Sequence, residues 1–153
     1  MRLLIAASLV ATASAAAWGQ TPPASIAIKP ELLIQARQSA YALSAGTFQG
    51  MEATVKGGGD VKPWAHAAGE MAEWAEAIPT MFPPGTEKGG DTKALPKVWS
   101  DTAGFAKAAG AYADAAKTLQ TAAKANDKAA FAVAFKTTAK ACGACHKAYR
   151  QKD

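Results

Sequence analysis

The residues best able to do chemistry form a pentapeptide close to the end of the chain, Cys142-Gly143-Ala144-Cys145-His146. It holds both cysteines and one of the two histidines of the 153 residues. Two thiols three positions apart, followed directly by an imidazole, have the spacing of covalent c-type haem attachment. Each thiol can add across one haem vinyl group, and the histidine can bind the iron from the same side. The motif therefore indicates one covalently attached haem c, held by Cys142 and Cys145 and ligated by His146.

Three other uses of a cysteine pair have to be weighed against this one. A thioredoxin-like redox pair needs a preceding strand and a helix N-terminus that lowers a thiol pKa, whereas residues 131–141 have the pattern of a helix. A zinc site needs a fourth ligand, which His66 or a carboxylate would have to supply. A disulfide between residues three positions apart closes too small a loop to constrain much of the chain. Haem attachment is the interpretation that we favour.

The N-terminus is typical of an exported protein. Met1 and Arg2 precede an apolar run over residues 3–10 and small residues over 11–17, which is the pattern of a secretory signal peptide. We expect a signal peptide over about residues 1–19 and a mature chain over 20–153. The apolar run is shorter than the roughly 20 residues of a membrane span, so we expect no span. Because bacteria attach haem c outside the cytoplasm, the signal and the motif together predict a periplasmic protein.

The composition suits one globular domain that does not bind nucleic acid. Residues 20–153 suffice for a single hydrophobic core. The chain has 17 Lys and Arg against 12 Asp and Glu, a formal net charge of +5. These basic residues form no lysine–arginine run and do not alternate with aromatic residues, as they do in segments that bind nucleic acid. We therefore interpret the charge as an ordinary solvated surface.

The residue pattern predicts a chain that is helical almost throughout. Alanine is abundant, β-branched runs are absent, and proline and glycine gather in a few places, which favours helix. We expect four helices, over about 30–56, from 60–63 to 78, from 96 to 125 and from there to about 150, with a long loop over 79–94. Such connections suit an antiparallel up-down-up-down bundle. The predicted fold class is all-α, a four-helix bundle with the haem at one end.

This topology limits which side chains can lie opposite His146. The first helix runs antiparallel to the fourth, so Arg37 and Tyr41 in its N-terminal half lie at the haem end. Met51 follows Tyr41 by ten residues, about 15 Å along the axis at 1.5 Å per residue, and is too distant to bind the iron. His66 begins the second helix at the opposite end. We therefore predict that Tyr41 covers the iron as a non-coordinating lid and leaves it five-coordinate.

Further segments extend the match with a known family beyond the haem motif. They are Arg37-Gln38-Ser39-Ala40 in the first helix, Pro84-Gly85-Thr86-Glu87 and Gly89-Gly90-Asp91 in the loop, Pro96-Lys97-Val98-Trp99-Ser100-Asp101 at the start of the third helix, and the terminal run from Cys142 to Arg150. In this order and spacing they make the chain resemble the cytochrome c′ family over essentially the whole mature chain. The up-down-up-down bundle is the known architecture of that family.

The resemblance implies roles for individual residues. The proximal histidine of the family corresponds to His146, and its thioether cysteines correspond to Cys142 and Cys145. Its arginine in the first helix, which commonly pairs with a haem propionate, corresponds to Arg37. The distal residue four places later corresponds to Tyr41, where other members carry leucine or another large apolar side chain.

Two further haem contacts and a function follow from the resemblance. The arginine four positions after the proximal histidine corresponds to Arg150, beside the proximal face, and we expect Phe82 to contact the haem as well. The family implies a periplasmic, usually homodimeric protein whose high-spin five-coordinate iron binds nitric oxide and carbon monoxide. Nitric oxide scavenging or storage is the implied role, with a redox partner that is not identified.

Two other functions stay open on the sequence. A low-spin periplasmic electron-transfer cytochrome would need a sixth iron ligand, which Met71 or Met81 could supply. An enzyme such as a peroxidase or a nitric oxide reductase would need a distal acid–base pair. The sequence places no carboxylate beside Tyr41, and His66 is remote. We therefore expect a gas-binding haem protein and not an enzyme.

Overall fold

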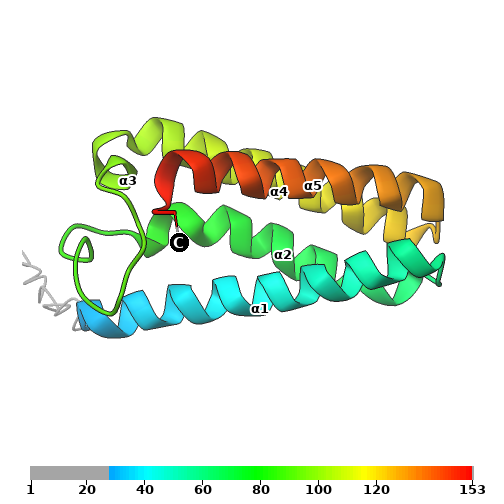
Figure 1. Cartoon of the computed structure of the whole chain (residues 1–153), viewed down its shortest axis with the longest axis horizontal. Helices are drawn as coiled ribbons and strands as arrows, with labels where there is room; N and C mark the ends of the chain where they lie inside the picture. Colours follow the sequence, from blue (N-terminus) through cyan, green and yellow to red (C-terminus); the bar gives the residue numbers. More distant parts are fainter. Residues whose placement is uncertain (1–27, 153) are drawn as a thin grey trace, which may run out of the picture.

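The computed structural model describes residues 28–152 and shows a helical bundle (Figure 1). The long helices are α1 (Pro30–Gly57), α2 (Ala65–Ala77), α4 (Thr102–Lys124) and α5 (Lys128–Tyr149), and the short elements are the 3-10 turns η1 (Lys62–Trp64) and η2 (Ile78–Met81) and the helix α3 (Lys97–Ser100). The predicted four-helix bundle is confirmed. The predicted signal peptide over residues 1–19 lies outside the described residues.

The four long helices run alternately up and down, and the two ends of the bundle differ (Figure 1). Short connections from α1 to α2 and from α4 to α5 lie at one end. The loop over residues 82–96, helix α3 and the last residues of the chain gather at the other. Helix α4 packs most extensively, against α2 and α5, whereas α1 meets its neighbours at fewer points. The end with the loop is therefore the more irregular one.

Helix boundaries follow the local sequence. Helix α1 begins at Pro30, which the first turn tolerates because its missing N–H has no partner there. It ends at Gly57 and is followed by Gly58, whose φ of 66° allows its N–H to bond the carbonyl of Thr54, as in a left-handed C-cap. Helix α5 begins after Asp127, whose carboxylate accepts a hydrogen bond of 2.9 Å from the N–H of Ala130.

The predicted third helix is interrupted at Asp101, which separates α3 from α4. Asp101 has φ −130° and ψ 59°, and its Oδ1 accepts a hydrogen bond of 3.0 Å from the N–H of Gly104. Its Oδ2 accepts another of 2.9 Å from the hydroxyl of Tyr149 on α5. Because aspartate side chains compete for backbone N–H groups and cap helices well, the chain starts a new helix here and does not continue the first.

The predicted second helix differs at its start, and a 3-10 turn follows its end. Asp60 accepts a hydrogen bond of 3.0 Å from the N–H of Lys62, as expected of a residue near a helix start, but the first turn is the 3-10 turn η1. The α-helix ends at Ala77, just before Pro79 as predicted, and Pro79 lies in the first turn of the 3-10 turn η2, which continues to Met81. Proline is tolerated there because its nitrogen is not needed as a donor.

Small residues determine how closely the core helices approach. Ala68 and Ala75 of α2 and Ala116 and Ala123 of α4 are completely buried. Larger side chains fill the space toward α1 and α5. There Phe48 stacks on Phe135, and Phe131 and Met51 are completely buried. The α2–α4 contact is thus the tight side of the bundle. None of the helices in residues 28–152 has both the length and the apolar character needed to cross a membrane.

The cap at Asp101 leads to a pH-dependent prediction. The hydrogen bond from Tyr149, followed by that from Gly104, lowers the pKa of Asp101. Because its folded pKa lies below the unfolded value of about 3.9, its stabilisation is complete above that value and disappears as pH falls through the folded pKa. The substitution Asp101→Ala should therefore lower the free energy of unfolding in urea at pH 6 and lower it less at pH 2.5. An equal loss at both values would contradict this account.

Candidate functional site

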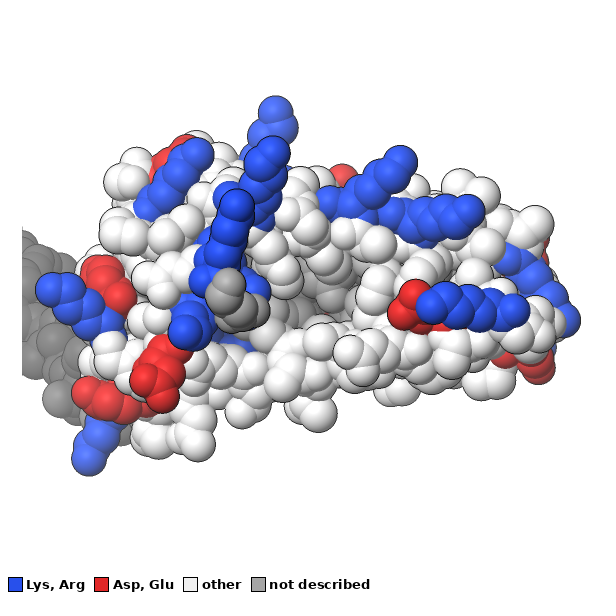
Figure 2. Space-filling model, viewed as in Figure 1, with Lys and Arg blue, Asp and Glu red and all other residues white. Residues whose placement is uncertain are grey.

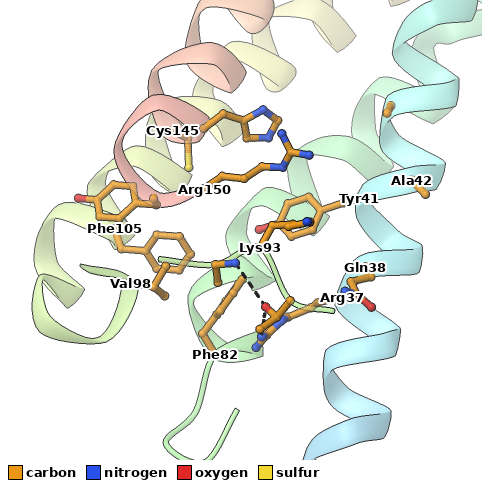
Figure 3. Close-up of a pocket in the computed structure, with 15 residues that line it drawn as sticks. Arg37, Gln38, Tyr41, Ala42, Phe82, Lys93, Val98, Phe105, Cys145 and Arg150 are labelled. Carbon is orange, nitrogen blue, oxygen red and sulfur yellow. Dashed lines mark hydrogen bonds between the residues drawn. The ribbon is translucent and has the colours of Figure 1, made fainter. Parts of the chain in front are cut away.

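A cavity of about 410 Å³ lies at the irregular end of the bundle (Figure 3). Its walls come from segments far apart in the sequence. Helix α1 contributes Arg37 and Tyr41, the loop contributes Phe82 and Lys93, and the end of α5 contributes Cys145 and His146. Helices α3 and α4 close it with apolar side chains. The size falls within the roughly 300–1,000 Å³ of ligand pockets in proteins.

The structure brings together most of the residues predicted for the site. Arg37, Tyr41, Phe82, Cys145, His146 and Arg150 all line the cavity. Cys142 does not: it lies one turn earlier on α5, half-buried against the core. Residues three apart on a helix point about 60° apart, since each residue turns the helix by about 100°. Cys142 therefore lies deeper along the same side of α5, where its thiol is close enough to influence Tyr112 of α4.

The two cysteines lack the environment of a reactive redox pair. Both are free and half-buried, in the last two turns of α5. Burial raises the pKa of Cys142 and of Cys145, and the proximity of Cys142 raises that of Cys145 further. Thiolates are favoured near helix N-termini, whereas the dipole at a C-terminus is negative. The thiols are thus held protonated, which disfavours a thioredoxin-like pair.

Arg37 is the polar centre of the cavity wall. Its side chain is only 2% exposed although it carries a full charge. Nη1 donates hydrogen bonds of 2.9 Å to Thr86 Oγ1 and 3.1 Å to the carbonyl of Met81, and Nη2 donates bonds of 2.8 Å to the carbonyl of Thr86 and 3.1 Å to Thr92 Oγ1. The guanidinium carbon lies 4.1 Å from the centre of the Phe82 ring. Arg37 thus ties α1 to the loop at several points.

This arrangement limits what else Arg37 can bind. Four of its five N–H groups are donated to the loop, so among the described residues the Nε–H is the donor left for another group. Burial lowers the pKa of Arg37, while Tyr41 and Glu87 oppose that effect. The sequence did not reveal Thr86 and Thr92 as partners of Arg37, because nothing in helical periodicity pairs a helix with loop residues about fifty positions away.

Tyr41 is a neutral phenol packed inside the cavity. It is half-buried, and its ring meets that of Trp74 edge to face with centroids 5.3 Å apart. Burial raises the pKa of Tyr41 strongly, and the nearby Cys145 raises it further. Arg37 lowers the pKa, but by less. A phenolate is the form that binds haem iron, so this environment disfavours coordination by Tyr41. Trp74 Nε1 is buried beside it without a hydrogen-bond partner among the described residues.

The alternative iron ligands lie away from the cavity. Met51 and Met71 are buried in the core, and Met81 contributes its carbonyl to Arg37 while its side chain is outside the lining. His66 is at the far end of α2, with its side chain 87% exposed and 3.6 Å from Glu70. Within residues 28–152, no three His, Cys, Asp or Glu side chains are grouped to hold a metal ion. Neither the low-spin nor the zinc hypothesis gains a ligand from this geometry.

The donor set of the cavity suits a covalently held haem. Aromatic side chains line it from several elements, a thiol and an imidazole come from consecutive positions of α5, and two guanidinium groups also belong to the lining. Apolar walls can contact the porphyrin ring. The thiol can bond a haem vinyl group, the imidazole can bind the iron, and a guanidinium can pair with a haem propionate. His146 and Arg150 are exposed at the mouth of the cavity.

The contacts of Arg37 generate a stability prediction. The substitution Arg37→Lys removes the forked donor that reaches Thr86 and Thr92 together. Since a hydrogen bond to a charged group contributes about 1.5–3 kcal/mol, we expect a loss of about 3 kcal/mol in the free energy of unfolding. Amides of residues 83–92 should exchange with deuterium faster than in the parent protein.

Two further variants make that measurement decisive. The substitution Thr86→Val, nearly equal in shape, should cost about 1–2 kcal/mol because Arg37 loses one acceptor and the carbonyl of Pro83 loses its donor. The substitution Arg150→Lys, at an exposed arginine of the same cavity, should change the unfolding free energy little. If Arg150→Lys were as damaging as Arg37→Lys, Arg37 would have no special part in holding the loop.

Comparison with known proteins is consistent with this site. The family model described as Cytochrome C' matches residues 33–150. Cytochrome c' of Rubrivivax gelatinosus is 38% identical over 126 residues, which cover 81% of this chain and 98% of the relative. Cytochrome c' of Alcaligenes xylosoxydans xylosoxydans is 39% identical over 126 residues, with coverages of 81% and 97%.

Solved structures agree in fold as well. The crystal structure of the Rubrivivax gelatinosus protein has a TM-score of 0.73 at 38% identity, covering 80% of this chain and 98% of that chain. Cytochrome c' from Thermochromatium tepidum has a TM-score of 0.76 at 29% identity, with coverages of 82% and 98%. Since the family model spans most of the described residues and near-full-length relatives exceed a third identity, the chain belongs to the cytochrome c′ family, whose proteins carry covalently attached haem c.

Proposed function

We propose that this chain is a periplasmic haem protein that binds nitric oxide and carbon monoxide at an open iron position and scavenges or stores nitric oxide. The observation that carries the proposal is the composition of the cavity. His146 lines it from α5 and Tyr41 lines it from the facing α1, while the methionines of the described residues lie outside it. An iron held by His146 would therefore meet a neutral phenol on its other side and no strong ligand.

We assign the chain's residues to the haem as follows. Cys142 and Cys145 form the two thioether bonds, and His146 binds the iron. Arg37 offers its remaining N–H and its positive charge to a propionate, and Arg150 stands at the proximal side. Phe82, under the guanidinium of Arg37, forms part of the apolar wall. The haem iron supplies the site at which a diatomic gas binds.

Tyr41 supports selectivity by occupying the space that a gas must enter. Its ring is packed against Trp74, and an edge-to-face aromatic pair contributes about 0.5–1.5 kcal/mol beyond its buried area. A gas has to displace this ring, so weakly bound gases are rejected and strongly bound ones are kept. A nitric oxide complex and a carbon monoxide complex of cytochrome c prime variants from Alcaligenes xylosoxidans are among the similar structures, at 35% and 36% identity.

Location and assembly complete the proposal. The signal-like N-terminus supports export to the periplasm. The outer face of α1 supports a homodimer, because Leu32 and Leu43 are 56% and 74% exposed. Eleven residues apart on a helix, they share one face, beside small residues such as Gly46.

The substitution Leu43→Glu should shift the protein from dimer to monomer in sedimentation equilibrium, whereas Val133→Glu on α5, also exposed, should not. A protein monomeric without substitution would exclude this dimer.

Electronic spectra of the purified holoprotein test the proposed function. We expect a high-spin ferric spectrum, and a change in the reduced spectrum when carbon monoxide is added. A low-spin reduced spectrum that carbon monoxide leaves unchanged would favour an electron-transfer cytochrome instead.

The double substitution Cys142→Ala and Cys145→Ala should leave haem that acidified organic solvent extracts from the chain, because no thioether bond retains it.

The same spectra measure the effect of the lid. The substitution Tyr41→Ala removes the ring that a gas must displace, so carbon monoxide affinity should rise about tenfold, equivalent to about 1.4 kcal/mol. The substitution Tyr41→Phe keeps the bulk and removes the hydroxyl, and it should stay within about threefold of the parent protein. An unchanged affinity in Tyr41→Ala would show that the ring does not restrict the gas site.

A further inference from the structure

Charge is distributed unevenly over the bundle. Between residues 128 and 152 the chain has six Lys and Arg and no Asp or Glu. Helix α2, in contrast, carries Glu70, Glu73 and Glu76 and neither Lys nor Arg. Lys136, Lys140 and Lys147 fall within about 40° of one another around α5, since each residue advances the helix by about 100°. Helix α5 therefore has a cationic outer face.

The cationic residues converge on the mouth of the cavity. The N–H of Leu95 donates a hydrogen bond of 2.9 Å to the carbonyl of Tyr149, and the N–H of Gln151 donates one of 2.8 Å to the carbonyl of Lys93. These two bonds join the loop to residues 149–151, so Ala94 lies opposite Arg150 and Lys93 lies opposite Gln151, one residue from Arg150. Lys93 and Arg150 both line the cavity (Figure 3).

Two basic residues of the cavity lining, Lys93 and Arg150, are joined by two lysines that lie within three residues of Arg150 in the chain. Lys93, Lys147, Arg150 and Lys152 are all exposed, and we call these four residues the cationic surface. Figure 2 shows basic side chains gathered beside the hollow of this face. The ion pairs of Lys side chains found in residues 28–152 involve Lys56, Lys97 and Lys117, and none of them belongs to this surface.

The acidic residues nearest along the chain are Asp153, which directly follows Lys152 and lies outside the described residues, and two residues of the loop. Asp91 lies two residues before Lys93, and Glu87 accepts a hydrogen bond of 2.8 Å from the N–H of Gly85. Helix α5 after its cap contributes no acidic residue to offset the lysines. Over residues 128–153, six basic residues stand against one acidic residue, so this end of the chain keeps an excess of positive charge.

We propose that the cationic surface is the docking site of an acidic redox protein that exchanges single electrons with the haem at the cavity mouth. This inference rests on the proposed haem site. In the exchange, the partner in its reduced form loses one electron and the ferric haem gains it, with no bond or proton transferred. Facing charges of opposite sign accelerate association and orient the partner. Glu70 and Glu73 of α2 disfavour docking on that side, whereas Glu76 is paired with Lys117.

Binding of oxidised flavodoxin, an acidic flavoprotein, to the ferric holoprotein tests the proposal without any electron transfer. The double variant Lys147→Glu and Lys152→Glu should weaken binding at low salt at least tenfold. The control variant Lys107→Glu and Lys124→Glu makes the same charge change at exposed residues of α4 and should weaken it less than threefold. Binding to the parent protein should also fall steeply as salt is added.

Reduction by flavodoxin hydroquinone should slow in parallel with binding in the first variant. Equal weakening in both double variants would overturn the proposal, because net charge and not this surface would then govern association. Binding to phosphatidylglycerol vesicles without binding to flavodoxin would overturn it in favour of a membrane surface. Absence of a haem spectrum would refute the proposed function itself, whereas a normal spectrum with failed docking would refute only this inference.

Discussion

The site depends on the hydrogen bonds that the buried guanidinium of Arg37 donates to η2 and the loop. A charged group that is 2% exposed is unfavourable unless its donors are satisfied. Thr86, Thr92 and Met81 satisfy them, and all three belong to the turn η2 or to the loop that follows. The loop is therefore not a free connection between two helices. The side chain of Arg37 on α1 determines the path of the loop. It therefore also holds in place the cavity wall that the loop forms.

The bundle positions the remaining groups by simple helical geometry. The alanine-rich contact between α2 and α4 draws these helices together, and the larger aromatic residues occupy the side toward α1 and α5. Tyr41 and His146 reach one cavity because α1 begins where α5 ends. The antiparallel order thus brings together two residues more than a hundred positions apart, with no further element required.

Much of this arrangement could be predicted from the sequence. The CxxCH motif, the helical pattern and the antiparallel topology sufficed to place Arg37 and Tyr41 at the same end as His146. Two kinds of feature could not be predicted. The break at Asp101 depends on Tyr149 of another helix, and the loop depends on its bonds to Arg37. Both are long-range pairings of polar side chains, which periodicity does not encode, whereas apolar stripes do reveal which helix faces are buried.

The two backbone bonds between residues 93–95 and 149–151 have a consequence for the stability of the cavity wall. They join the loop to the end of α5, so the wall formed by Lys93 and Ala94 cannot move away from α5 without breaking both bonds. The cysteines precede these bonds by only one or two helical turns. Opening of this wall would therefore be coupled to fraying of the last turn of α5, the turn that carries the imidazole.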